Sequence, residues 1–135
     1  DGIRDIGVTG VQTCALPILM VNTMIGIEQQ LRILHWQTDS YAQHKAFGET
    51  YAALGDLIDS FMEEYMGKYG KISLQSRAIQ VINMQELDLA DFVDGSAEFL
   101  TSLTSQLDPA DTNLLNIRDE MLGEMRKLKY LLTLQ

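Results

Sequence analysis

The sequence is poor in residues that cross-link a chain or interrupt a helix. Its 135 residues include one cysteine and only two prolines. A single thiol cannot form a disulfide within the chain, and sites built from several thiolates are excluded as well. With so few prolines, long helices can run without a break.

Basic residues are also scarce, with 10 Lys and Arg against 19 Asp and Glu, for a net charge of −9. An acidic surface repels a phosphate backbone, so we expect no DNA binding. No apolar run reaches the roughly 20 residues needed to cross a bilayer, because Asn22 and Thr23 interrupt the apolar stretch at 18–27. We expect a cytoplasmic protein without a membrane partner, located in the host bacterial cytoplasm if a phage encodes it.

The first eighteen residues differ in character from the rest. The stretch VTGVQTCALPI at 8–18 is the translation of a common sequencing-library adapter. We therefore interpret residues 1–18 as adapter-derived and exclude them, together with Cys14, from the reasoning about the fold. Residues 19–135 are then long enough for one domain with a real core. A loop-like native tail is the alternative interpretation of the same segment.

Apolar residues at helical spacing fill most of the chain and predict an all-α protein. The helices are expected at about 19–37, 40–67, 88–107 and 109–134. The apolar stripe of the first helix consists of Met20, Met24, Ile27, Leu31 and Leu34. Residues 71–86 lack a helical stripe and suit an extended crossover. Two helical hairpins joined by one long connection are typical of a ferritin-like four-helix bundle. The connection is long enough to let the second and third helices lie parallel.

Residues that commonly cap helices stand at both short junctions. Thr38, Asp39 and Ser40 are good N-cap types at the first corner. At the second junction, Asp108 is expected to cap the fourth helix, with Pro109 in the first helical position. These signals place the corners of the two hairpins.

The two histidines of the chain, His35 and His44, flank the first corner. Asp59 and Glu63 lie one turn apart on the second expected helix, so their carboxylates can converge on one ion. Imidazole nitrogen with carboxylate oxygen is a ligand set suited to iron, manganese or zinc. A capping or hydrogen-bonding role for each histidine is the plainer alternative.

Distance restricts how these candidates can cooperate. His44 and Asp59 are fifteen residues apart on one helix, or roughly 22 Å at 1.5 Å per residue. Because ligand bonds are only about 2 Å long, one ion cannot contact both in one chain. Either the residues are unrelated, or a two-fold dimer brings the acidic pair of one copy to the histidines of another.

The pattern LHWQT…H…DLIDSFMEE resembles the Dps proteins, the miniferritins. The resemblance implies a ferroxidase centre between subunits, with iron as cofactor and His35, His44, Asp59 and Glu63 as ligands. It also implies a homo-oligomer, either a two-fold dimer or a larger shell. Glu28 and Trp36 are candidates for supporting the ligands. The nine residues from His35 to His44 are a shorter spacing than the twelve usual in that family.

Two further stretches, HWQTDSYAQHKAFGETYAAL and LLNIRDEMLGEMRKLKYLLTLQ, resemble an uncharacterised family of small proteins in tailed bacteriophages. That family has no assigned activity. The resemblance therefore implies a phage origin and adds a second hypothesis for function. In that hypothesis the protein is a non-enzymatic phage accessory or structural protein that keeps the ferritin-like bundle.

Overall fold

A computed structural model of the chain describes residues 15–74 and 78–134, with the backbone alone for 15–17. These residues form four α-helices, one 3-10 turn and no strand. In chain order the elements are α1 (Ala15–Gln37), α2 (Tyr41–Tyr69), η2 (Met84–Glu86), α3 (Leu89–Gln106) and α4 (Thr112–Leu131). The expected all-α class is confirmed.

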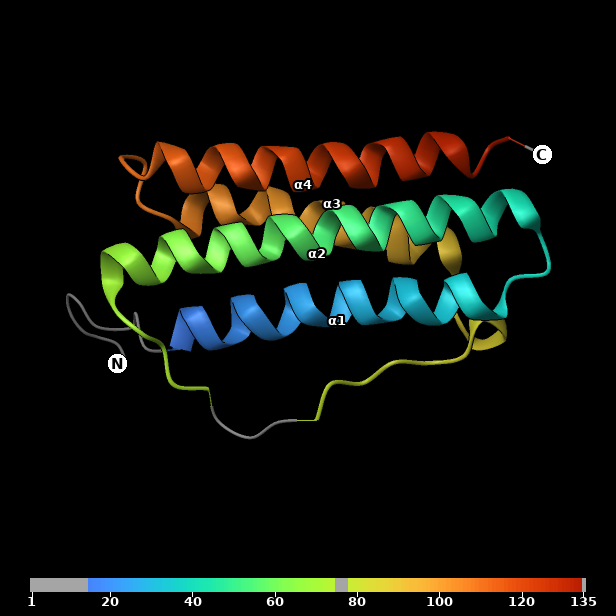
Figure 1. Ribbon diagram of the computed structural model, residues 1–135, viewed down its shortest axis with the longest axis horizontal. Coiled ribbons are helices and arrows are strands. Elements are labelled where there is room, and N and C mark those ends of the chain that lie inside the picture. The colour runs from blue at the N-terminus through green and yellow to red at the C-terminus, as the bar shows by residue number, and fades with distance from the viewer. Residues whose placement is uncertain (1–14, 75–77, 135) are drawn as a thin grey trace.

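The helices form a bundle of two antiparallel hairpins (Figure 1). In the first hairpin α1 packs on α2, in the second α3 packs on α4, and α2 packs on α4 between them. After α2 the chain runs back along α1 before α3 begins, so α2 and α3 point the same way (Figure 1). The parallel course of these two helices agrees with the expectation from the length of the connection.

The second half of the crossover is fixed to α1 by two glutamines. The side chain of Gln30 donates to the carbonyl of Ile82 (2.9 Å) and accepts from its amide (3.0 Å). Gln37, two turns further along α1, donates to Asn83 Oδ1 (2.9 Å) and accepts from the amide of Met84 (2.7 Å). The described part of the crossover is therefore irregular backbone ending in a 3-10 turn, and side chains of α1 rather than strand pairing satisfy the backbone polar groups of Ile82 and the amide of Met84.

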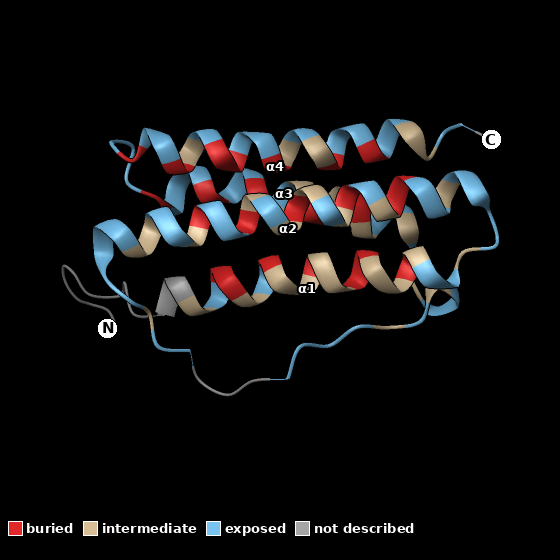
Figure 2. Cartoon of the chain, viewed as in Figure 1, coloured by how far each residue is buried: buried red, intermediate tan, exposed pale blue. Residues whose placement is uncertain are grey.

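The core lies where the apolar stripes of the four helices meet, as the inward red bands of Figure 2 show. Phe47 and Phe61 of α2 and Leu103 of α3 are completely buried. The stripe predicted for the first helix is buried throughout: Met20, Met24, Ile27, Leu31 and Leu34. Spacing alone thus identified the face of α1 that packs inward.

The start of α1 and both ends of α4 differ from the prediction by three residues or more. Helix α1 begins at Ala15, before the expected start at 19, and residues 1–14 lie outside the described part of the chain. Helix α4 begins at Thr112 with Asp111 in the N-cap position. The carboxylate of Asp108 accepts from the amide of Ala110 (2.9 Å) and so closes a separate turn. Pro109 lies in that turn, so its assignment to the first helical position was wrong.

The first corner follows the prediction. The Ser40 side chain accepts from the amide of Gln43 (3.2 Å) and caps α2.

Among the described helices, none combines the length and apolar character needed to cross a bilayer.

Candidate functional site

The two histidines hold the corner between α1 and α2 through reciprocal hydrogen bonds. His35 Nδ1 donates to the backbone carbonyl of His44 (2.7 Å), and His44 Nδ1 donates to the carbonyl of His35 (2.8 Å). Their rings stack with centroids 3.9 Å apart and planes 17° apart. Because a carbonyl only accepts, each Nδ1 carries a proton. In the neutral rings both Nε2 atoms therefore keep a free lone pair.

A glycine provides the space for this pair. Gly48 lies one turn after His44 on α2, facing α1. A Cβ at Gly48 would lie 2.8 Å from Cε1 and 2.9 Å from Nδ1 of His35. The ring of His35 can rest on the backbone of α2 only because no side chain is present there.

A line of aromatic and charged groups continues from the histidines along the seam between α1 and α2. The ring of Tyr51 meets that of His35 edge-on, with centroids 5.4 Å apart. The guanidinium of Arg32 lies over the ring of Tyr51, 4.7 Å from its centroid. Such a cation–π contact stabilises a half-buried Arg. The Nε of Arg32 is buried and makes no hydrogen bond.

The series of side chains between α1 and α2 ends in one acidic residue, Glu28. The candidate ligand pair, Asp59 and Glu63, does not form this end. The carboxylate of Glu28 rests on Gly55, where a Cβ would lie 2.8 Å from Oε2. Burial raises the pKa of Glu28, the positive charge of Arg32 lowers it, and the neighbouring Asp59 raises it further. Glu28 therefore faces the α2 backbone near the candidate ligand Asp59, and its role in supporting the ligands stays a prediction.

The four candidate ligands do not come together in one copy of the chain. His35 and His44 meet at the corner, whereas Asp59 and Glu63 are exposed further along α2. Within the described part of the chain, no three His, Cys, Asp or Glu side chains gather around one point. A site using all four requires a second copy. Trp36 is 64% exposed and gives the histidines little cover.

The stacking also limits how the histidines can bind metal. Because the ring planes are nearly parallel, the in-plane lone pairs of the two Nε2 atoms cannot both point at one ion. The pair suits one ion per imidazole, or no ion, unless a ring turns and gives up its hydrogen bond. The same stacking and hydrogen bonds also hold together the corner of the hairpin formed by α1 and α2.

Comparison with known proteins identifies the family. Residues 35–132 match the family of unknown function DUF5856. The chain belongs to the DUF5856 family. It is also 32% identical over 101 residues to the "Uncharacterized 14.6 kDa protein in mobD-ri intergenic region" of Enterobacteria phage T4, covering 75% of each chain. No solved structure matches. These findings support the resemblance to a tailed-phage family, and neither match bears on iron.

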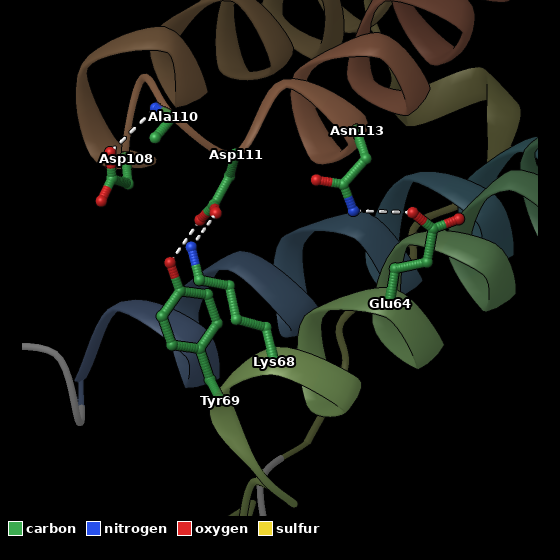
Figure 3. Close-up of polar contacts among 7 residues, drawn as sticks. All are labelled: Glu64, Lys68, Tyr69, Asp108, Ala110, Asp111 and Asn113. Carbon is green, nitrogen blue, oxygen red and sulfur yellow. Dashed lines mark hydrogen bonds and ion pairs between the residues drawn. The ribbon is translucent and has the colours of Figure 1, made fainter.

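This DUF5856 protein has a second polar cluster, which the sequence reasoning missed, at the far end of α2 (Figure 3). The buried carboxylate of Asp111 accepts hydrogen bonds from Lys68 and Tyr69. These bonds lower the pKa of Asp111, and the bond to Asp111 raises the pKa of Tyr69. Nearby, Asn113 donates to Glu64 (2.8 Å). The cluster joins the last turns of α2 to the start of α4.

Proposed function

We propose that this DUF5856 protein is a non-enzymatic accessory protein of a tailed phage, built on a ferritin-like bundle and active as a homo-oligomer. The phage T4 relative supports the origin. The two hairpins, the long crossover and the parallel α2 and α3 support the ferritin-like topology.

The histidine pair is the observation that carries the non-enzymatic role. Both rings already have a structural task, because each donates to the backbone of the other helix end and stacks on its partner. Gly48 has no side chain, and the ring of His35 occupies the space that a side chain would fill. The result is a rigid corner that needs no metal. Two exposed aromatic residues flank it, Trp36 at 64% and Tyr41 at 74% exposure, and they are available for association.

Thermal unfolding with and without metal tests this role. A ligand present at 100 times its dissociation constant stabilises the folded state by about 2.7 kcal/mol. We expect the Tm to be equal in EDTA and under anaerobic Fe(II), and to fall when His44→Ala removes half of the pair. A higher Tm in Fe(II) that is lost in His44→Ala would contradict the structural role.

Sedimentation at low micromolar concentration tests the homo-oligomer. The chain has a mass of 15.2 kDa. We expect a species at twice that mass or above. A single species at the chain mass would contradict this part of the proposal.

The second candidate is an iron-binding protein with a ferroxidase site between copies. The free Nε2 lone pairs of His35 and His44 favour it, because Nδ1 protons fixed by carbonyls are the arrangement that orients a histidine ligand. Asp59 and Glu63 of a second copy would supply the carboxylates, and Fe(II) would be the substrate.

Complementation separates the second candidate from the first. His44→Ala and Asp59→Ala would each abolish Fe(II) binding in anaerobic titration. Refolding the two variants together would restore it in part, since one interface of the mixed dimer keeps an intact His44 and an intact Asp59. Parent protein that takes up no stoichiometric Fe(II) would exclude this candidate.

A further inference from the structure

A groove of about 410 Å³ lies between α1 and α3, which approach each other far less closely than the other neighbouring helices of the bundle. Gly26 of α1 and Gly95 of α3 line it, and Gln80 of the crossover provides a third wall. Its volume falls within the range of roughly 300–1,000 Å³ that is typical of small-molecule sites. Because the crossover closes one side, the groove suits a small molecule better than a partner helix, which needs a channel open along its length.

The two glycines keep the groove open. Among the residues that the structure describes, a Cβ at Gly95 would have no neighbour within 4 Å, and one at Gly26 would reach only Ile79 of the crossover, at 3.9 Å. Gly48 and Gly55 differ, because side chains of α1 occupy the space beside them. A glycine inside a helix lowers stability relative to alanine. Packing within the chain explains Gly48 and Gly55, but not the two glycines of the groove.

Two aromatic residues provide apolar surface in the groove. Phe92 and Phe99 of α3 lie seven residues apart, or about 10.5 Å along the helix, with Gly95 between them. Both are only half-buried in the chain, and Ile27 of α1 lines the same groove. A molecule that covers this surface gains free energy from its removal from water. The groove therefore accepts an apolar body about as long as the spacing of the two rings.

Three of the hydrogen-bonding side chains that line the groove are already used within the chain. Thr23 Oγ1 donates to a backbone carbonyl of α1 (2.9 Å), and Ser96 Oγ donates to one of α3 (2.8 Å). The side-chain amide of Gln30 is bonded to the backbone of the crossover. Gln80 and Asp91 also line the groove and are exposed. A ligand therefore meets few polar groups, and most of its body must be apolar.

Asp91 determines which charge the groove selects. It is the one charged residue among the described residues that line the groove, and it takes part in none of the ion pairs that join described residues. Exposed neighbours on α3 are acidic as well, since Asp88 precedes it by three residues and Glu98 follows it by seven. The chain as a whole has a net charge of −9. A cation is therefore attracted to this end of the groove, and an anion is repelled.

We propose that this groove binds a small organic cation that carries an ammonium group on an apolar body. The body lies beside Gly95, between the rings of Phe92 and Phe99, and the ammonium group lies next to the carboxylate of Asp91. The charge of Asp91 identifies the sign of the ligand, and the engaged polar side chains identify its apolar body. The site shares no residue with the histidine pair, so it goes beyond the proposed function without depending on it.

Three probes of nearly equal size test the sign of the charge: phenylbutylammonium, phenylbutanol and phenylbutyrate. Each is titrated into the full chain at neutral pH and low salt, and NMR follows the backbone amides of Gly26 and Gly95. We expect saturable shifts of both amides, with the ammonium compound bound about three- to five-fold more tightly than the alcohol. The carboxylate should bind more weakly than the alcohol. Methylammonium, which lacks the apolar body, should give no saturable shift.

Filling the groove should abolish binding without loss of folding. Gly95→Leu places a side chain where a Cβ has open space, and it replaces glycine by a better helix former. We expect its Tm to be no lower than that of the parent, and its affinity for phenylbutylammonium to fall at least about ten-fold. Gly123→Leu on α4, whose Cβ also has open space, is the matched control and should bind like the parent.

Asp91→Asn tests the charge separately. It should lower the affinity for the ammonium compound to that for the alcohol, and leave the affinity for the alcohol unchanged. Glu120→Gln on the exposed side of α4 makes the same change in net charge and should keep the preference of the parent.

Binding in the expected order of probes, lost in Gly95→Leu and made independent of charge in Asp91→Asn, supports the site. No saturable shift of Gly26 and Gly95 at millimolar phenylbutylammonium would overturn it. Equal affinity for the three probes would overturn the selection by Asp91, and binding that survives in Gly95→Leu would place the ligand elsewhere on the acidic surface. If Gly95→Leu melts lower than the parent, the comparison of Asp91→Asn with Glu120→Gln decides the proposal.

Discussion

The imidazole of His35 lies directly on the backbone of Gly48, closer than any other residue at position 48 would permit. A Cβ there would be 2.8 Å from Cε1 of the ring. A helical glycine normally costs stability, about 1 kcal/mol relative to alanine. Its presence here is explained by the ring that occupies the space.

Gly48→Ala is therefore expected to destabilise the protein although it improves helix propensity. The added methyl group must displace His35 from its stack, at a cost of about 1–3 kcal/mol in the free energy of unfolding. Urea unfolding measures the change. Gly123→Ala on α4 is the matched control, because its Cβ would have no neighbour within 4 Å. The control should gain up to about 1 kcal/mol. Equal gains in both variants would show that His35 is not held there.

The two histidines are expected to act as one energetic unit. Replacing either by alanine removes both the stack and one or both reciprocal bonds, so the second replacement should cost much less than the first. A double-mutant cycle with His35→Ala and His44→Ala should give a coupling of about 1–2 kcal/mol. Additive losses would mean that the reciprocal arrangement does not form in solution.

Glu28 is expected to lower stability at neutral pH. Its pKa in the folded state is raised above the ordinary 4.5, mainly by burial, so the folded state binds the proton more tightly than the unfolded chain. The free energy of unfolding then falls as pH rises from 4.5 through the raised pKa. Glu28→Gln should have a higher Tm at neutral pH and a flatter profile across that window. The exposed Glu120→Gln should change neither, and a Glu28→Gln profile parallel to the parent would refute the burial argument.

Asp111 is expected to show the opposite dependence. Hydrogen bonds from Lys68 and Tyr69 hold its pKa below the ordinary 3.8. Its contribution is complete above 3.8 and is lost as pH falls through the lowered pKa. Asp111→Asn should melt lower than the parent at neutral pH, and the difference should vanish in strong acid. Asp119→Asn, whose ion pair with Arg118 leaves it 62% exposed, is the control and should melt close to the parent.

The sequence was informative where a structure depends on local periodicity and uninformative where it depends on distant partners. The stripe from Met20 to Leu34 is buried as predicted, because helical spacing alone selects that face. The Asp111 cluster joins residues more than forty positions apart, and no local pattern marks such a contact. The histidine pair could be predicted only in part. Gly48, one turn after His44, was a visible sign that something packs closely there, but the sequence does not show what.

The contacts between the helices also affect how the bundle unfolds. Helices α1 and α3 approach each other far less closely than the other neighbours, and a groove of about 410 Å³ separates them beside Gly26 and Gly95. The two hairpins are thus joined mainly along α2 and α4. For the two hairpins to unfold together, the contacts between α2 and α4 must couple them. If the contacts between α2 and α4 break first, each hairpin becomes a separate unfolding unit. Hydrogen exchange would then report two stabilities within one small domain.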